Sequence, residues 1–333
     1  DGSKDSNNHL FQFEKAKKKD AEKTENRLQN RRKNLFQDKD ADELKRKRDE
    51  KNVALRKEVK KNKFAKRRNY GVQMQSDSAT TKSETETDSY TVEQTESMWH
   101  EGMDIMDYFT ILAKTDFQLP HFFLLIELIC SKDDHKVLFG IVGLRKLLSL
   151  IDNPPIQNVI DANLLPTLIN LIGRSDIPRI QFEVLWCLTN IASGKAEHVQ
   201  ALIDKGTIPI FISLLGSDHK NIVEQSIWAL GNIAGEDSYY KALILKEGAI
   251  RPLGIILSKS ETNSMLTRNC IWCITNLLRG KPLPEIDELF YIIPIISECL
   301  KNNSRKEIVI DGMWALSYIS DAGIKAIINM IEC

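Results

Sequence analysis

The segment Leu185-Trp186-Cys187-Leu188-Thr189-Asn190 decides the fold, because the chain repeats it three more times with small changes. The other copies are Ile227-Trp228-Ala229-Leu230-Gly231-Asn232, Ile271-Trp272-Cys273-Ile274-Thr275-Asn276 and Met313-Trp314-Ala315-Leu316-Ser317-Tyr318. The tryptophans are 42, 44 and 42 residues apart, and three of the four are followed four positions later by asparagine. This regular period indicates that the region consists of stacked copies of one structural unit.

The period is that of helical armadillo or HEAT units, so we predict an all-α, right-handed superhelical solenoid with a long concave face. Before each Trp helix the sequence has an entry segment and an apolar helix; the entry segments are 162–166, 205–209, 247–252 and 291–294. Glycine can end one helix in the left-handed conformation, and proline is tolerated in the first turn of the next. A weaker copy at 141–149, with Val142 in the Trp position and Lys146 in the Asn position, gives about five repeats in 105–333.

The rest of the chain divides by charge. Residues 1–25 are polar, which predicts a disordered tail. Residues 26–70 predict a basic, conditionally helical arm that needs an acidic partner, with 18 basic and 7 acidic residues from Arg27 to Arg68. Residues 71–104 are rich in Ser, Thr, Glu and Asp, without hydrophobic periodicity, and predict a flexible acidic linker.

The composition argues against several classes of function. No apolar run reaches the roughly 20 residues of a membrane span, and the N-terminus has no signal-peptide core. Cys270 and Cys273 form a CxxC, but Cys273 takes a position where other repeats have alanine, so we expect a small buried slot and not a metal site. We predict no enzyme, cofactor or metal, since the histidines are scattered and no phosphate loop or nucleophile elbow is present. Cysteine usage favours a reduced, intracellular protein.

The Trp–Asn pairs predict a binding surface. Residues four apart on a helix lie on one face, so each repeat presents an indole and an amide together. The asparagines could hold the backbone of an extended peptide, and basic side chains could lie between indoles, each cation–π contact contributing about 0.5–2 kcal/mol. Two alternatives stay open: the tryptophans could be core residues, and the asparagines could hydrogen-bond between repeats, because an unpartnered buried amide costs about 1–3 kcal/mol.

Two parts of the chain resemble one family. The segments WCLTNIASG (186–194), IWALGNIAGE (227–236) and RNCIWCITNLLRG (268–280) are similar to the armadillo repeats of importin alpha, and residues 26–70 are similar to its importin-beta-binding domain. The resemblance implies a nuclear import adaptor that shuttles between cytoplasm and nucleus. Its implied partners are importin beta and cargo with basic nuclear localisation signals, with neither nucleic acid nor membrane.

The resemblance also implies the site residues. The peptide-binding residues would be Trp186, Asn190, Gly194, Gln225, Trp228, Asn232, Glu236, Trp272, Asn276, Asp311 and Trp314. Glu236 stands where the family typically has aspartate, and Val199 stands where it has a threonine of the lysine pocket. Lys66-Arg67-Arg68 would be the autoinhibitory segment, which occupies the cargo site until importin beta removes it.

Two other functions are weighed against this one. An armadillo scaffold for adhesion or signalling, of the beta-catenin kind, would need basic residues where this chain has Trp and Asn. Nucleic-acid binding by the arm is disfavoured by its interleaved acids and few aromatic residues. Because the apolar segment 326–331 is followed by no polar capping repeat, we expect a fragment or a truncated product.

Overall fold

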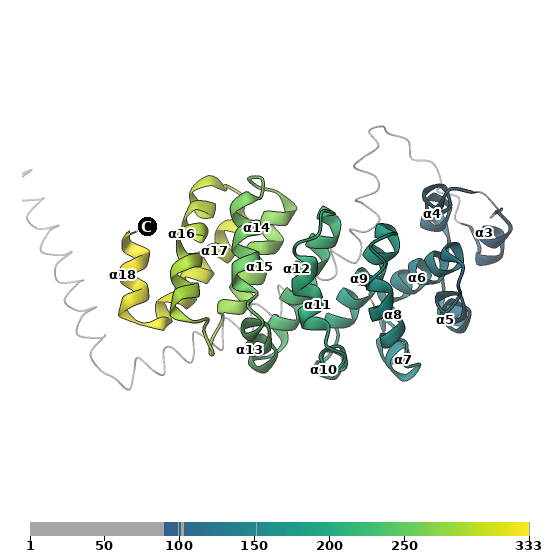
Figure 1. The fold of residues 1–333 in the computed structure, drawn as a ribbon, viewed down its shortest axis with the longest axis horizontal. Coiled ribbons are helices and arrows are strands. Elements are labelled where there is room, and N and C mark those ends of the chain that lie inside the picture. Colours follow the sequence, from purple (N-terminus) through teal and green to yellow (C-terminus); the bar gives the residue numbers. More distant parts are fainter. Residues whose placement is uncertain (1–89, 99, 101–102, 151, 333) are drawn as a thin grey trace, which may run out of the picture. The chain divides into compact units, whose positions relative to one another are not determined.

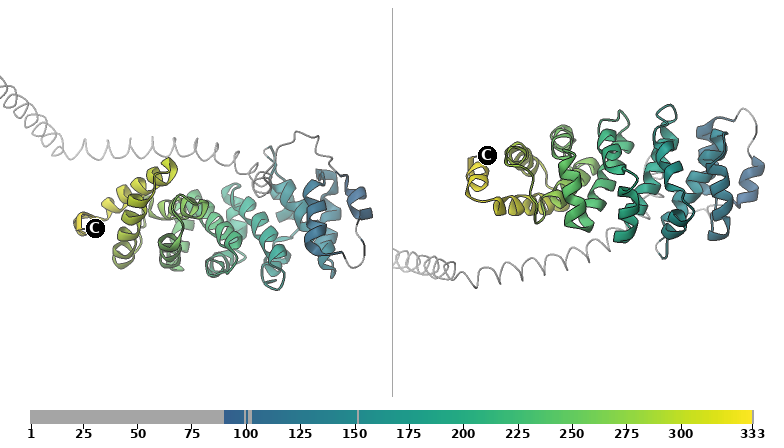
Figure 2. Two further views of the ribbon diagram at one scale, coloured as in Figure 1. Left: turned by 90° about the horizontal axis from the view of Figure 1, so that it is seen from above. Right: turned by 60° about the horizontal axis from the view of Figure 1, so that its bottom comes forward.

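The computed structural model describes residues 90–98, 100, 103–150 and 152–332, and this part of the chain is helical. Its helices follow one another in a row, from α3 (Val92–Met98) and α4 (Ile105–Lys114) at one end to α18 (Ile324–Glu332) at the other (Figure 1). The two further views show the same order (Figure 2). The all-α repeat architecture predicted from the 42-residue period is therefore confirmed. The tail, the arm and the linker up to residue 89 lie outside the described residues.

The helices group into repeats that each end in a Trp helix or its equivalent. The first has η1 (Leu119–His121), α5 (Phe122–Ile129) and α6 (Asp134–Leu148). Three full repeats follow: α7 (Ile156–Asp161), α8 (Leu165–Ile172) and α9 (Pro178–Ala192); α10 (Ala196–Ile203), α11 (Thr207–Leu214) and α12 (Lys220–Glu236); α13 (Ser238–Lys246), α14 (Ile250–Lys259) and α15 (Met265–Leu278). Then come α16 (Ile286–Asn302), α17 (Lys306–Ile319), η2 (Ser320–Ala322) and α18.

Residues with positive φ separate the first two helices of the full repeats. Gly206 and Gly248 have φ of 69° and 73°, and Asn163 has φ of 49°. These are residue types that adopt the left-handed conformation with little strain. In the last repeat the prediction that 291–294 ends a helix is wrong, because Pro294 lies inside the continuous helix α16. The segment before Pro294 has neither Gly nor Asn, so nothing in it favours the left-handed turn.

The linker predicted over 71–104 is also corrected at its end, because residues 92–98 form α3. Thr91 and Gln94 make a reciprocal cap: the Thr91 N–H donates to Gln94 Oε1 at 2.8 Å, and the Gln94 N–H donates to Thr91 Oγ1 at 3.2 Å. Thr95 is buried and its hydroxyl bonds that of Thr115 at 2.7 Å. The buried side chain of Val92, the Thr95–Thr115 bond and two backbone bonds of the adjacent Tyr90, to Lys114 and Asp116, fix this helix. Hydrophobic periodicity does not reveal such a short element.

The core is formed by apolar side chains between successive helices, and the four buried cysteines belong to it. Cys270 and Cys273 are fully buried, as the small-slot interpretation predicts, and burial raises the pKa of both thiols. The Cys270 thiol donates to the Leu253 carbonyl at 3.1 Å. Within the described ranges no group of three or more His, Cys, Asp and Glu residues could hold a metal ion. No helix of that part is long and apolar enough to cross a membrane.

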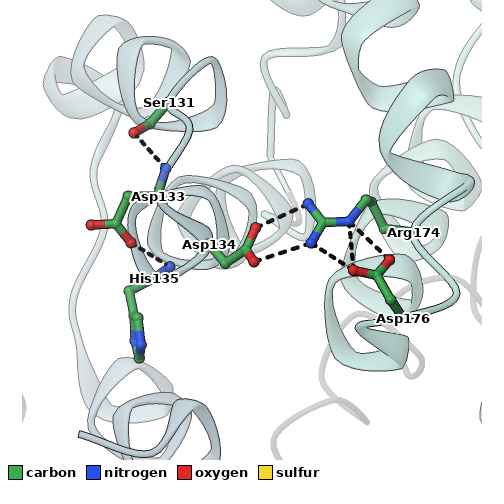
Figure 3. Close-up of polar contacts among 6 residues, drawn as sticks. All are labelled: Ser131, Asp133, Asp134, His135, Arg174 and Asp176. Carbon is green, nitrogen blue, oxygen red and sulfur yellow. Dashed lines mark hydrogen bonds and ion pairs between the residues drawn. The ribbon is translucent and has the colours of Figure 1, made fainter. Parts of the chain in front are cut away.

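A charged clamp joins the first repeat to the second (Figure 3). Arg174, in the loop after α8, donates from Nη1 and Nη2 to the two carboxylate oxygens of Asp134 at 2.9 and 3.0 Å. It also pairs with Asp176 at 2.8 Å. These two carboxylates raise the pKa of the Arg174 guanidinium. Asp134 is the first residue of α6, where a negative charge also complements the helix dipole. The clamp therefore fixes the start of α6 against the second repeat.

Candidate functional site

The predicted peptide-binding residues, except Gly194, come from one continuous stack of helices. We call α6, α9, α12, α15 and α17 the ladder helices; each is in contact with the next. In α6, α9, α12 and α15 the third residue after the Trp position contacts the following repeat. We call this the spacer position, and its residues are Arg145, Thr189, Gly231, Thr275 and Ser317.

The ladder asparagines hydrogen-bond between repeats. Asn232 donates from Nδ2 to the Thr189 carbonyl at 3.2 Å, and Asn276 donates to the Gly231 carbonyl at 3.0 Å. Asn190 donates to the Ser149 hydroxyl at 3.0 Å, which in turn donates to the Arg145 carbonyl at 2.7 Å. Each amide thus reaches the spacer carbonyl of the preceding repeat, directly or through one hydroxyl.

These contacts decide one alternative left open by the sequence. Asn190, Asn232 and Asn276 are only 7%, 1% and 8% exposed, so their amides do not form an openly exposed stripe. Their N–H groups are used for inter-repeat bonding. The spacing alone could not reveal this, because an amide on the ladder face can turn toward the neighbouring helix as readily as toward solvent.

The spacer threonines make the complementary contact toward the next repeat. Thr189 donates from Oγ1 to the Gln225 carbonyl at 3.3 Å, and Thr275 donates to the Asp311 carbonyl at 2.9 Å. Gln225 and Asp311 each lie three residues before a repeat Trp. The backbone at these two predicted site positions is therefore fixed by the preceding repeat.

The ladder tryptophans are partly exposed and not sealed in the core. The Trp272 ring lies directly over Gly231 of the preceding repeat: a Cβ added to Gly231 would be 2.7 Å from Cη2 and 2.8 Å from Cε3. Trp314 stacks on Tyr318 of its own helix, with ring centroids 5.9 Å apart and an interplanar angle of 25°. The last repeat therefore has an aromatic partner where the three preceding repeats have asparagine.

Two buried acceptors on α12 have no hydrogen-bond partner among the described residues. They are Gln225 Oε1, three residues before Trp228, and Asn232 Oδ1, four residues after it. Their side chains are 8% and 1% exposed. A buried acceptor without a donor costs about 1–3 kcal/mol, so a ligand or water that supplies an N–H or O–H here would recover that cost.

The remaining predicted residues lie around the ends of the ladder helices. Glu236 is the last residue of α12 and is partly exposed. Gly194 follows α9 and packs tightly, because a Cβ there would clash with His198 and lie 3.0 Å from Ile156 Cδ1. Val199 is fully buried, so the apolar side chain faces the core. Lys66, Arg67 and Arg68 lie outside the described residues.

Three polar residues near the ladder were not predicted. Glu183 and Asn269 are buried and lie three residues before Trp186 and Trp272, as Gln225 and Asp311 do before their own tryptophans. Extending that offset to every repeat would have found them. Arg145 was missed because it belongs to the weak first copy, although it is the one cation among the small residues of the spacer position.

Glu183 holds two arginines at the α6–α9 junction. Arg145 Nε lies 2.8 Å from Glu183 Oε2, and Arg179 Nη2 lies 3.2 Å from Glu183 Oε1. Burial lowers the pKa of Arg179, against the opposing effect of Glu183. Nearby, Lys146 donates from Nζ to the Leu112 and Thr115 carbonyls at 3.1 and 2.6 Å, and burial lowers its pKa to about 8. This junction therefore carries more cations than anions.

Comparison with known proteins agrees with both halves of the sequence interpretation. The Importin beta binding domain family matches residues 29–106, and the Armadillo/beta-catenin-like repeat family matches 152–193 and 195–235. Importin subunit alpha-2 of Arabidopsis thaliana is 43% identical over 188 residues, which cover 56% of this chain and 35% of that protein. Importin subunit alpha-4 of the same plant is 32% identical over 293 residues, which cover 88% of this chain and 50% of that protein.

The fold matches solved armadillo proteins. A designed armadillo repeat protein, YIII(Dq.V1)4CPAF in complex with peptide (KR)4, superposes with a TM-score of 0.55 at 22% identity, over 63% of this chain and 86% of that one. The described region is thus an armadillo repeat solenoid. Together with the importin-beta-binding match, this places the chain in the importin alpha family, whose members are not enzymes. The chain spans 35% and 50% of the lengths of the two relatives above.

Proposed function

We propose that this chain is a nuclear import adaptor, which binds basic nuclear localisation signals along its ladder helices and importin beta through residues 26–70. The observation that carries the proposal is the presence of two modules in one chain. The first is the importin-beta-binding match at 29–106, and the second is the row of ladder helices in 105–333, whose partly exposed tryptophans (Trp186, Trp228, Trp272 and Trp314) we call rungs. Such an adaptor would shuttle between cytoplasm and nucleus.

The ladder supports the cargo half of this proposal. Trp186, Trp228, Trp272 and Trp314 are partly exposed at regular intervals along a fixed stack. Aliphatic stems of Lys or Arg can lie against such rings and place their charges over the faces. The unpartnered oxygens of Gln225 and Asn232 are buried, so they would accept peptide N–H groups only after their side chains turn toward the peptide. The peptide (KR)4 in the similar designed protein has the same chemistry of alternating cations.

The sequence suggests that the ladder asparagines hold the peptide backbone as both donors and acceptors, and the inter-repeat hydrogen bonds of their N–H groups change this role. Since the N–H groups of Asn190, Asn232 and Asn276 bond the preceding repeat, the asparagines would act toward a peptide mainly as acceptors. Glu236 and Asp311, at the end of α12 and near the start of α17, would take cargo ammonium groups. Gly194 and Trp314 would line the two outer parts of the site.

The basic arm supports the importin beta half. Segment 27–68 carries 18 basic and 7 acidic residues and could bind an acidic partner. Lys66-Arg67-Arg68 could also compete with cargo for the ladder helices. The chain between Arg68 and Tyr90 is long enough to let this segment reach them, since it spans up to about 75 Å when fully extended. A tethered competitor at an effective concentration on the order of mM weakens cargo binding until importin beta takes the arm.

Fluorescence anisotropy with a labelled Lys/Arg peptide tests the cargo half on the full chain. Trp228→Ala should raise the peptide Kd at least tenfold, and replacing Lys66, Arg67 and Arg68 together by alanine should lower it. Tyr239→Ala is the matched control, because that aromatic ring is 58% exposed on α13, which is not a ladder helix. Unchanged affinity in Trp228→Ala would remove the ladder from the proposal.

The armadillo scaffold for adhesion or signalling complexes is the alternative. It would have to bind acidic segments, whereas the ladder offers Gln225, Glu236 and Asp311 beside its indoles. A labelled poly-Glu peptide in the same assay separates the two, since only the scaffold function predicts that it binds.

A further inference from the structure

Besides lacking the Trp and Asn of the later repeats, the α6 end of the ladder differs from the other ladder helices at the spacer position. At the spacer position the second to fifth ladder helices carry Thr189, Gly231, Thr275 and Ser317, which are all small, and α6 carries Arg145. At Gly231 the ring of the following Trp lies directly on the helix backbone, with no room for a side chain. At Arg145 the corresponding space holds a guanidinium.

This guanidinium covers the following rung. Arg145 Cζ lies 4.8 Å from the centroid of the Trp186 ring, within the range of a cation–π contact. Because Arg145 belongs to α6, it approaches the indole from the side of the first repeat. The chain thus places its own cation where a basic peptide side chain would stack.

Arg145 is held firmly in this position. Its Nε donates to Glu183 Oε2 at 2.8 Å, and the two side chains are only 11% and 1% exposed. Arg179 pairs with the other oxygen of the same carboxylate. This one charge-assisted hydrogen bond to a buried carboxylate holds Arg145 Nε in place. The contact between Arg145 and the Trp186 ring is therefore stabilised by the ion pair with Glu183.

The charges at this end also oppose a further cation. Arg145, Arg179 and Lys146 are cationic, against two carboxylates, Glu183 between the arginines and Asp116 near Lys146. A cargo lysine beyond Trp186 on the α6 side would meet like charges and would find the indole face already covered.

We propose that Arg145 closes the α6 end of the peptide site, so that basic side chains are accepted from Trp186 toward α17 and disfavoured beyond it. Arg145 is then a specificity-determining residue that limits the length of the basic cluster and fixes its register. This inference rests on the proposed function, because it concerns the same peptide site.

The test compares three labelled peptides on the full chain: a basic core flanked by Gly-Ser, and two versions with two extra lysines at one or the other end. In the unchanged protein, one extension should lower the Kd and the other should change it less than twofold. Arg145→Gln keeps an amide that can still donate to Glu183. In this variant the extension that had little effect on the unchanged protein should now improve binding, so that the Kd of the core peptide divided by the Kd of that extended peptide rises at least threefold. Arg251→Gln is the control, because Arg251 also covers a ring, Tyr291 at 5.1 Å, but lies on α14.

The outcomes separate the inference from the function on which it rests. If the core peptide does not bind, the proposed function fails and the inference falls with it. If the core binds but both extensions improve binding equally in the unchanged protein, or the ratio is the same in Arg145→Gln, only the inference is overturned. Circular dichroism and thermal melting check that Arg145→Gln folds. Should it not fold, the comparison of the two extensions on the unchanged protein decides.

Discussion

The indole of Trp272 lies directly against Gly231 of the preceding repeat, so that a Cβ on Gly231 would stand 2.7 Å from Cη2 and 2.8 Å from Cε3. The same glycine accepts the Asn276 amide through its carbonyl at 3.0 Å. One residue therefore receives both members of a Trp–Asn pair. This relationship shows that the pair is positioned by the neighbouring repeat as much as by its own helix.

Gly231→Ala should displace the Trp272 ring. Overpacking costs about 1–3 kcal/mol, and the gain in helix propensity offsets about 1 kcal/mol, so we expect a net loss of about 1 kcal/mol of unfolding free energy. Peptide affinity should fall about fivefold or more, because the ring leaves its place in the ladder. Urea unfolding and fluorescence anisotropy measure the two effects. Gly216→Ala is the control, since its nearest atom, Ser213 O, is 3.5 Å from the added Cβ.

Two substitutions of Asn232 separate the contribution of its amide N–H to stability from that of its side-chain volume. Asn232→Ala removes the hydrogen bond to the Thr189 carbonyl and should cost about 1 kcal/mol. Asn232→Asp should cost more, since it places a buried carboxyl beside a carbonyl and cannot donate when ionised. Chemical denaturation at pH 7 should give the stability order Asn, Ala, Asp. An aspartate variant as stable as alanine would contradict the inter-repeat bond.

The sequence predicted the rungs correctly but not the direction in which their polar groups point. The Trp period and the entry residues of the full repeats fix the helices, because both are local properties of the chain. The partners of Asn190, Asn232 and Asn276 lie 41 to 45 residues away and depend on how far one repeat is rotated against the next. That rotation is set by packing across the whole interface, which no single segment encodes.

Two other differences have equally specific causes. Pro294 was expected to open a helix, but without a Gly or Asn before it the chain continues through the proline as α16. Arg145 was hidden by the weakness of the first repeat, where Val142 stands at the Trp position. Its role follows from a contact with Trp186, 41 positions further along the chain.

The Arg174–Asp134 clamp should contribute modestly to stability and depend on salt. The two side chains are 33% and 37% exposed, so a double-mutant cycle with Arg174→Gln and Asp134→Asn should give a coupling of about 0.5–1 kcal/mol. The bidentate geometry in Figure 3 favours the upper end of this range. The Lys195–Glu197 pair, 3.7 Å apart and mostly exposed, should show no measurable coupling. A coupling that stays constant from 0.05 to 1 M NaCl would contradict this account.

Lys241 should make stability depend on alkaline pH. This lysine of α13 is 1% exposed, its Nζ donates to the Arg279 and Gly280 carbonyls at 2.8 and 3.0 Å, and burial lowers its pKa to about 8. The unfolded chain has the ordinary value of about 10.4. Below pH 8 both states carry the proton, and the folded state bears the full cost of the buried charge. Between pH 8 and 10.4 the folded lysine loses its proton first, so this cost declines as pH rises.

The measurement is the unfolding free energy of the unchanged protein relative to Lys241→Met as a function of pH. The difference should shift in favour of the unchanged protein by up to about 1.4 kcal/mol per pH unit between pH 8 and 10, and stay level from pH 6 to 7.5. Working with the difference cancels groups common to both proteins, such as Lys146 and the buried thiols. Lys246→Met, at an exposed position in the same helix, should show no such trend. A flat difference across the alkaline range would mean that Lys241 retains its ordinary pKa in the folded state.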